Sequence, residues 1–211
     1  MAVVTISRMF GSGGSEVAAE LARRLQWALL DNAFMERVAL GLHVTPAHME
    51  AIEERRPSLA ERIADAFAYS AQEMLSAPMG APLPPTEERI LEVTHRVIDE
   101  AIARGPVVLV GRGAQACLAN RDDAVHVLCV ASRAVCLSRV MAREQLSSAA
   151  AERLVDETNR RRHDFVRRNW QREWLDPTNY HACVNTGWLG IEGAVTFLES
   201  VVRAHFDASQ R

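Results

Sequence analysis

Short apolar runs alternate with helical stretches along the chain, and this alternation restricts the fold more than any other feature. Five runs are expected to be strands: 3–6, 27–31, 107–110, 125–130 and 180–185. Strands that are apolar throughout and separated by helices form a parallel sheet with helices on both faces. At 211 residues, the chain is therefore expected to be one α/β domain.

Helical patterns fill most of the remaining sequence. The expected helices are 15–25, 32–40, 45–54, 58–75, 86–104, 132–144, 147–168 and 191–205. A proline-rich segment at 78–85 is expected to be a loop. In a parallel sheet of this kind, ligands bind beyond the carboxyl ends of the strands. We therefore expect the loop 8–15, Asp31 and the turn 111–113 to lie along one edge of the sheet.

A glycine-rich loop follows the first strand: Arg8-Met9-Phe10-Gly11-Ser12-Gly13-Gly14-Ser15. It has the layout of the phosphate-binding loop G-x-x-x-x-G-K-[ST]. Glycines allow an anion to approach the backbone closely, and the amides and dipole at the start of the next helix attract phosphate. The predicted phosphate-binding residues are Gly11, Ser12, Gly13, Gly14 and Ser15, with the Ser15 hydroxyl near magnesium.

The loop departs from this pattern at two positions, because Arg8 stands in place of the first glycine and Gly14 in place of the lysine. The chain contains no lysine at all, so every permanent cationic contact to phosphate has to come from arginine. Two interpretations of Arg8 follow. It either supplies the missing charge, or it pairs with Glu16 and holds the loop shut.

An arginine-rich segment, 159–172, suggests a second source of positive charge. Arg160, Asp164 and Arg167 fall on one helix face, where the acid can hold the arginines in position. One interpretation is a lid that places Arg160 and Arg167 over transferring phosphates. A solvated helix face is the simpler alternative. RNA binding would also fit basic and aromatic residues, but the net charge of -3 argues against a nucleic-acid partner.

Cysteine usage and hydropathy indicate a cytoplasmic protein. The four cysteines form no C-x-x-C pair, and Cys129 and Cys183 lie in apolar runs. We therefore expect reduced thiols, with these two side chains buried as small hydrophobic groups. We expect no signal peptide and no membrane partner, because no apolar stretch approaches the roughly 20 residues of a membrane-spanning helix.

Several segments together carry a resemblance to a known family. They are Ile6-Ser7-Arg8…Phe10-Gly11-Ser12-Gly13-Gly14, Leu30-Asp31-Asn32, Val110-Gly111-Arg112-Gly113-Ala114 and Asp176-Pro177…Asn179-Tyr180…Val184-Asn185-Thr186. With these segments in this order, the chain resembles the cytidylate kinase-like family. That family is similar to CMP kinases and belongs to the nucleoside monophosphate kinase branch of the P-loop proteins.

The resemblance implies a molecule of three parts. These are a P-loop core (1–41, 105–150 and 178–211), a helical acceptor lobe (about 42–104) and a mobile, arginine-rich lid (about 151–177). It also implies ATP as phosphate donor, magnesium, and a nucleoside monophosphate as acceptor. The segment 42–85 matches the family least, and we expect it to form either the acceptor lobe or the surface of a homodimer.

Individual residues match the family's functional positions. Asp31 and Arg37 match the motif that follows the second strand in CMP kinases, and Arg112 matches a Gly-Arg turn that meets the monophosphate. The lid pattern R-x-x-x-D-x-x-R is matched by Arg160, Asp164 and Arg167. The expected roles are acceptor binding by Asp31, Arg37, Arg112 and Asp164, and catalysis by Arg8, Arg160 and Arg167.

The sequence thus predicts an ATP-dependent phosphotransferase that acts on a nucleoside monophosphate such as CMP. Positioning and charge stabilisation dominate phosphoryl transfer, so this chemistry does not strictly require a general base. The alternative is a non-catalytic module that binds a nucleotide or another anion. True CMP kinases keep the loop lysine and a following threonine, whereas this chain has Gly14 and Glu16 at those positions.

Overall fold

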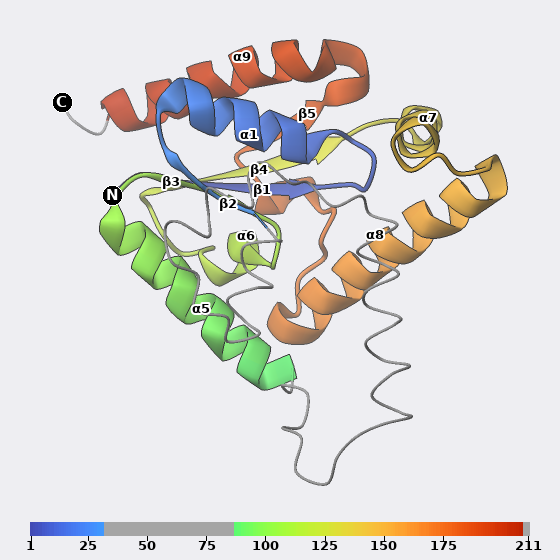
Figure 1. The fold of residues 1–211 in the computed structure, drawn as a ribbon. Coiled ribbons are helices and arrows are strands. Elements are labelled where there is room, and N and C mark those ends of the chain that lie inside the picture. The colour runs from blue at the N-terminus through green and yellow to red at the C-terminus, as the bar shows by residue number, and fades with distance from the viewer. Residues whose placement is uncertain (32–86, 209–211) are drawn as a thin grey trace, which may run out of the picture.

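The computed structural model describes residues 1–31 and 87–208 (Figure 1). Five strands form one parallel sheet in the order β2-β3-β1-β4-β5. They are β1 (Val3–Arg8), β2 (Ala28–Leu30), β3 (Val107–Val110), β4 (Ala124–Val130) and β5 (Ala182–Asn185). The predicted parallel α/β sheet is confirmed. The predictions for helices at 32–40, 45–54 and 58–75, for the loop at 78–85 and for Arg37 lie outside the described residues.

Helices cover both faces of the sheet, as Figure 1 shows. They are α1 (Gly14–Leu25), α5 (Glu87–Arg104), α6 (Ala114–Cys117), α7 (Arg133–Glu144), α8 (Ser148–Trp170) and α9 (Thr186–Ala208), with a 3-10 turn η1 (Pro177–Asn179). The sequence did not predict α6 and η1, because elements this short show no hydrophobic period. Helix α9 begins at Thr186 rather than at 191, with a kink at Gly190. The side-chain oxygen of Asn185 accepts hydrogen bonds from two backbone amides of this added turn.

The centre of the sheet is fully buried, which fixes the position of the strand that leads into the glycine-rich loop. All six residues of β1 are buried between β3 and β4. Val4 and Ile6 face α1 and α9, whereas Val3 faces the opposite side, where α5 and α6 pack. Helix α1 runs back over the sheet from the carboxyl end of β1, so the loop between them lies at the edge where the sequence predicts it.

The edge strands differ from the sequence expectation of apolar burial on both faces. In β5, buried and exposed residues alternate, and Cys183 is exposed. The prediction that Cys183 is buried was therefore wrong, because β5 has a neighbouring strand on one side only. Cys129, in the interior strand β4 between β1 and β5, is buried as predicted, and all four cysteines are free thiols.

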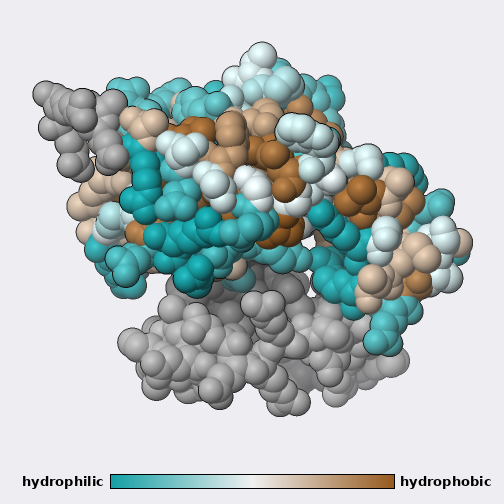
Figure 2. Space-filling model, turned by 90° about the horizontal axis from the view of Figure 1, so that it is seen from above, coloured by the Kyte–Doolittle hydropathy of each residue, from teal (hydrophilic) through white to brown (hydrophobic). Residues whose placement is uncertain are grey.

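Seen from above, over α9 and α1, the surface mixes hydrophilic and hydrophobic residues (Figure 2). None of the helices in the described part of the chain has the length and apolar character needed to cross a membrane.

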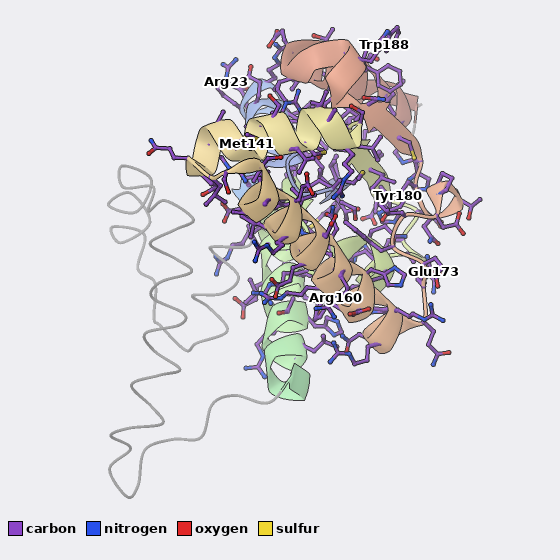
Figure 3. The ribbon with its side chains drawn as sticks, turned by 90° about the vertical axis from the view of Figure 1, so that its right-hand side faces the viewer. Arg23, Met141, Arg160, Glu173, Tyr180 and Trp188 are labelled. Carbon is purple, nitrogen blue, oxygen red and sulfur yellow. The ribbon has the colours of Figure 1, made fainter. Side chains whose placement is uncertain are left out.

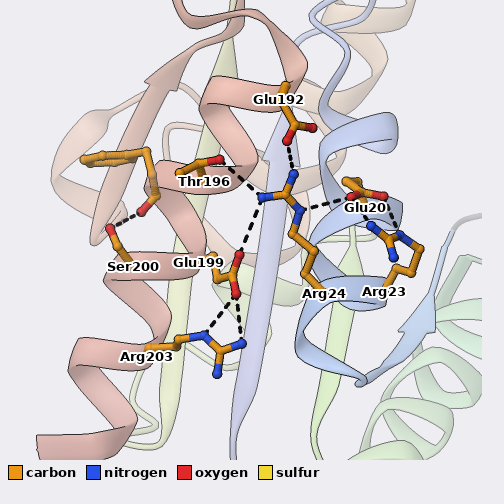
Figure 4. Close-up of polar contacts among 9 residues, drawn as sticks. Glu20, Arg23, Arg24, Glu192, Thr196, Glu199, Ser200 and Arg203 are labelled. Carbon is orange, nitrogen blue, oxygen red and sulfur yellow. Dashed lines mark hydrogen bonds and ion pairs between the residues drawn. The ribbon is translucent and has the colours of Figure 1, made fainter.

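Helices α1 and α9 are joined by a network of ion pairs centred on Arg24 (Figure 4). The Arg24 guanidinium lies 3.0 Å from Glu20 on its own helix and 3.6 Å from Glu199 on α9. It also contacts Glu192 and donates a hydrogen bond of 3.2 Å to Thr196. The side chain is only 22% exposed, so its charge is screened less than that of an ordinary surface arginine.

We expect Arg24→Met to lower Tm by about 2–4 °C, because the change removes contacts to two helices at once. Arg23→Met is the matched control, since Arg23 is 71% exposed and pairs with Glu20 on the same helix. Differential scanning calorimetry at low salt measures both variants. Equal Tm values for the two would show that the network does not hold α9 on α1.

Candidate functional site

The loop between β1 and α1 has the backbone geometry of an anion cradle. Gly11 and Gly13 have φ of 81° and 79°, in the left-handed region that favours glycine. A Cβ atom on Gly11 would also lie 2.6 Å from the backbone oxygen of Cys136, closer than real Cβ contacts. The Ser12 amide donates to the Met9 carbonyl at 3.2 Å and closes the turn. Both glycines are thus required by the shape of the loop.

The first turn of α1 differs from those of α7 and α8. At the starts of α7 and α8, Ser132 and Ser147 each accept a hydrogen bond from an amide of the first turn. The N-cap of α1 is Gly13, which has no side chain to cap the first amides of the helix. Within the described part of the chain, the hydroxyl of Ser12 is fully buried and has no hydrogen-bond partner. Uncapped amides at a helix start attract an anion from outside the chain.

Two residues from other elements hold the loop backbone in place. The Arg139 guanidinium, on α7, donates to the Ser12 carbonyl at 2.7 Å and to the Thr186 hydroxyl at 2.9 Å. Thr186, at the start of α9, also donates to the Ser12 carbonyl. Sequence reasoning missed Arg139, which lies inside an ordinary amphipathic helix. Thr186 lies in one of the segments that carry the family resemblance, and nothing else in the sequence indicated a role for it at the loop.

Helix α8 contacts the loop through two residues that the sequence analysis did not assign. The Asn159 side-chain oxygen accepts a hydrogen bond of 2.8 Å from the Phe10 amide. The Arg162 guanidinium donates a hydrogen bond of 2.6 Å to the Arg8 carbonyl. The Phe10 ring lies against the guanidinium groups of Arg162 and Arg143, at 5.6 Å and 5.1 Å from the ring centre. These are cation–π distances, so positive charge gathers beside the loop.

The predicted lid residues share one face of α8, but that face is exposed. The Arg160 side chain is 70% exposed and lies 4.0 Å from Asp164. The Arg167 side chain is 65% exposed and lies 3.1 Å from Glu173. Figure 3 shows Arg160 midway along α8 and Glu173 beyond its end. Arg162 lies about 200° around the helix from Arg160, so in this arrangement the loop meets Arg162 and not Arg160.

The guanidinium groups of Arg8 and Arg162 place positive charge where little solvent reaches it. Arg8 is only 7% exposed, and this burial lowers the pKa of its guanidinium to about 10. The charge of Asp31 opposes that pKa shift, and the charge of Arg112 adds to it. Burial also lowers the pKa of Arg162 to about 9, with Arg8 and Arg143 adding to the effect. A bound anion would offset this mutual repulsion.

The Gly111-Arg112-Gly113 turn reaches the same edge of the sheet from β3. All three residues have positive φ, of 76°, 52° and 68°. The other described non-glycine residues with positive φ are the helix C-caps Gln26, Gln145 and Gln171. Arg112 ends no helix, so its strained backbone points to a function. A Cβ on Gly113 would lie 2.3 Å from Trp170, so the turn packs against the end of α8.

The remaining predicted residues lie around this centre. Ser15 is exposed in the first turn of α1, and Asp31 is exposed directly after β2. Asp31 is the acid whose charge acts on Arg8, whereas the Glu16 side chain is exposed to solvent. The structure therefore brings the loop, Arg8, Asp31 and Arg112 to one edge of the sheet.

The loop and the Gly-Arg-Gly turn suggest membership of a kinase family, and comparison with known families identifies it. A model of the cytidylate kinase-like family matches residues 3–187. The chain belongs to this family. A search of curated proteins finds no match.

Solved structures show that the family's fold is shared by kinases of low sequence identity. An uncharacterized protein from Eubacterium ventriosum has a TM-score of 0.70 and 17% identity, covering 96% of this chain and 98% of its own. A shikimate kinase from Bacteroides thetaiotaomicron has a TM-score of 0.52 and 14% identity, with 96% and 98% covered. A gluconokinase from Sinorhizobium meliloti has a TM-score of 0.51 and 13% identity, with 99% and 97% covered. At these identities the likeness concerns the fold alone.

The resemblance segment 176–180 has a structural role in this member of the cytidylate kinase-like family. The Asp176 carboxylate caps η1 by accepting hydrogen bonds from the Thr178 amide and hydroxyl, at 2.9 Å and 2.7 Å. The Tyr180 hydroxyl donates to the Trp174 carbonyl at 2.6 Å. These bonds fix the chain as it returns from α8 to β5.

Proposed function

We propose that this protein is an ATP-dependent phosphotransferase whose acceptor is a small phosphorylated compound, most simply a nucleoside monophosphate such as CMP. Membership of the cytidylate kinase-like family and a fold shared with kinases support a phosphotransferase. One observation carries the proposal further. The first turn of α1 has no side-chain cap at Gly13, and three arginines are grouped at the loop before it. The charge of Arg112 acts on Arg8, and Arg162 is acted on by Arg8 and donates to its carbonyl.

The proposed reaction moves one phosphoryl group. An oxygen of the acceptor phosphate attacks the γ-phosphorus of ATP, the bond from phosphorus to the bridging oxygen breaks, and ADP leaves with that electron pair. The amides of Gly11, Gly13, Gly14 and Ser15 hold the donor phosphates, whereas the Ser12 amide closes the turn. Arg112 binds the acceptor phosphate together with Arg37, and Asp31 orients the acceptor. Such a site accelerates transfer by positioning and by preorganised charge.

The residues around the loop fit magnesium that is carried mainly by the nucleotide. Within residues 1–31 and 87–208, no group of three or more histidine, cysteine or acidic side chains could hold a metal by itself. Magnesium commonly binds through substrate phosphates, water and one or two protein oxygens. The exposed Ser15 hydroxyl is the expected protein ligand, with Asp31 as a second oxygen donor. When bound, the ion would offset charge on the phosphates.

We expect the purified protein to release ADP from Mg-ATP in the presence of at least one nucleoside monophosphate. A coupled ADP-release assay across CMP, UMP, AMP, GMP and dCMP tests this, with hydrolysis in the absence of acceptor as the background. Binding of ATP by calorimetry without turnover on any acceptor would instead establish the non-catalytic nucleotide-binding module. If no monophosphate and no ATP bound at all, neither function would stand.

A further inference from the structure

Gly14 and Arg8 compete for the same space beneath the loop. A Cβ atom on Gly14 would lie 2.4 Å from the Cβ of Arg8 and 3.0 Å from the Cβ of Cys129. Side chains do not approach one another as closely as the first of these distances. Gly14 is not among the described glycines with positive φ, so its backbone torsion does not demand glycine. The demand comes from the position of the Arg8 side chain.

The same position holds the lysine in the standard phosphate-binding loop. A lysine at position 14 and an arginine at position 8 therefore exclude each other in this backbone. The chain has the arginine, and the glycine gives it room. The two departures from the loop pattern are thus one coupled change rather than two independent losses.

Arg8 is built into the site rather than lying loosely on its surface. Its carbonyl accepts a hydrogen bond from Arg162, and the next amide, that of Met9, donates to Cys129 at 3.0 Å. These bonds fix the peptide group that follows Arg8, and the residue is only 7% exposed. The buried, unpartnered hydroxyl of Ser12 lies in the same loop, among the described residues.

We propose that Arg8 binds the donor polyphosphate from the strand side of the loop, in the role that lysine at position 14 has in the standard loop. This inference rests on the proposed function, because it names the cation that meets the donor phosphates. The ligand class is a nucleoside triphosphate recognised through its polyphosphate. An arginine there offers a planar fork that donates to two phosphate oxygens, whereas a lysine is a point charge.

The test measures binding of ATP and of inorganic tripolyphosphate by calorimetry, with Tm as the control for folding. Arg8→Met is expected to weaken both affinities about 10–100-fold, since a charge-assisted contact is lost. Arg203→Met is the matched control. Arg203 pairs with Glu199 on α9, far along the chain from the loop. We expect this variant to bind both ligands as tightly as the wild type. Equal affinities in folded Arg8→Met would overturn the inference.

A double substitution tests the exchange itself. Gly14→Lys alone is expected to lower Tm through the clash with Arg8, and Arg8→Gly alone to weaken tripolyphosphate binding. The variant with both changes restores the standard lysine and removes the clash with Arg8, leaving only the 3.0 Å contact with Cys129, so we expect it to bind at least tenfold more tightly than Arg8→Gly. If the folded double variant bound no more tightly than Arg8→Gly, the two positions would not be exchangeable and the inference would fail.

The outcomes separate this inference from the proposed function. If the wild-type protein bound neither ATP nor tripolyphosphate, the proposed function itself would fail. If the wild type bound both ligands and folded Arg8→Met bound them with equal affinity, only the role of Arg8 would fail. Should the variants not fold, a crystal of the wild type with tripolyphosphate decides. The Arg8 guanidinium within hydrogen-bond distance of a phosphate oxygen supports the inference, and any larger separation contradicts it.

Discussion

Arg162→Met is expected to lower kcat roughly a thousandfold while the protein stays folded, a loss of about 4 kcal/mol of transition-state stabilisation. Arg162 is the α8 arginine that the structure holds against the loop, through its bond of 2.6 Å to the Arg8 carbonyl. Its pKa is lowered by burial and by Arg8 and Arg143, which marks a charge that is poorly compensated inside the protein. Negative charge on a phosphoryl group during transfer would compensate the positive charge of Arg162.

Neighbouring arginines on the same helix give the control. Arg161→Met removes a guanidinium that is 71% exposed and paired with Glu157, so we expect kcat close to that of the wild type. Steady-state kinetics on the acceptor found in the ADP-release assay, with circular dichroism for folding, compare the variants. If Arg160→Met or Arg167→Met lowered kcat more than Arg162→Met, the sequence-based assignment of the lid would be right and the structural one wrong.

The difference between these arginines shows where sequence reasoning ends. The spacing of Arg160, Asp164 and Arg167 correctly indicates a shared helix face, and the ion pair of 4.0 Å follows from it. Nothing in that spacing says which face turns toward the loop. The rotation of α8 is set by packing, because Val155 and Val166 are buried against other elements. Asn159 and Arg162 then point to the loop as a consequence.

The fold was more accessible to sequence reasoning than the site. Runs such as Val107–Val110 are apolar at every position and can only be strands or short buried helix segments, and their alternation with helices settles the choice. The glycine-rich loop was predictable because its torsions demand glycine at fixed positions. Its supports were not, since Arg139 and Thr186 meet Ser12 only through the tertiary fold.

The second large effect concerns stability in acid, and its source is His126 in β4, an interior strand of the sheet. The residue is 2% exposed, its Nδ1 lies 2.8 Å from the Thr5 hydroxyl, and its ring stacks on that of His181 with ring centres 5.0 Å apart. The His126 amide donates to Nδ1 of His181 at 3.0 Å. Burial, with the charges of His181 and Arg172, lowers the pKa of His126 from 6.5 to about 4.

The sign of the effect follows from proton binding. Between pH 6.5 and about 4 the unfolded chain binds a proton at His126 and the folded protein does not, so acid favours unfolding. The unfolding free energy should therefore be greatest above pH 6.5 and fall by about 3 kcal/mol by pH 4, below which the loss levels off. Lowered carboxyl pKa values, such as that of Asp123 at about 2, take effect mainly below pH 4.

His126→Asn isolates this contribution, because asparagine keeps a polar atom near the Thr5 hydroxyl and cannot be protonated in this range. Urea unfolding at several pH values from 4.5 to 7.5 measures the slope of stability against pH, which should flatten in this variant even though the variant is less stable at neutral pH. His205→Asn is the control, since this histidine is exposed on α9, and it should keep the wild-type slope. A wild-type slope in His126→Asn would place the acid sensitivity elsewhere in the chain.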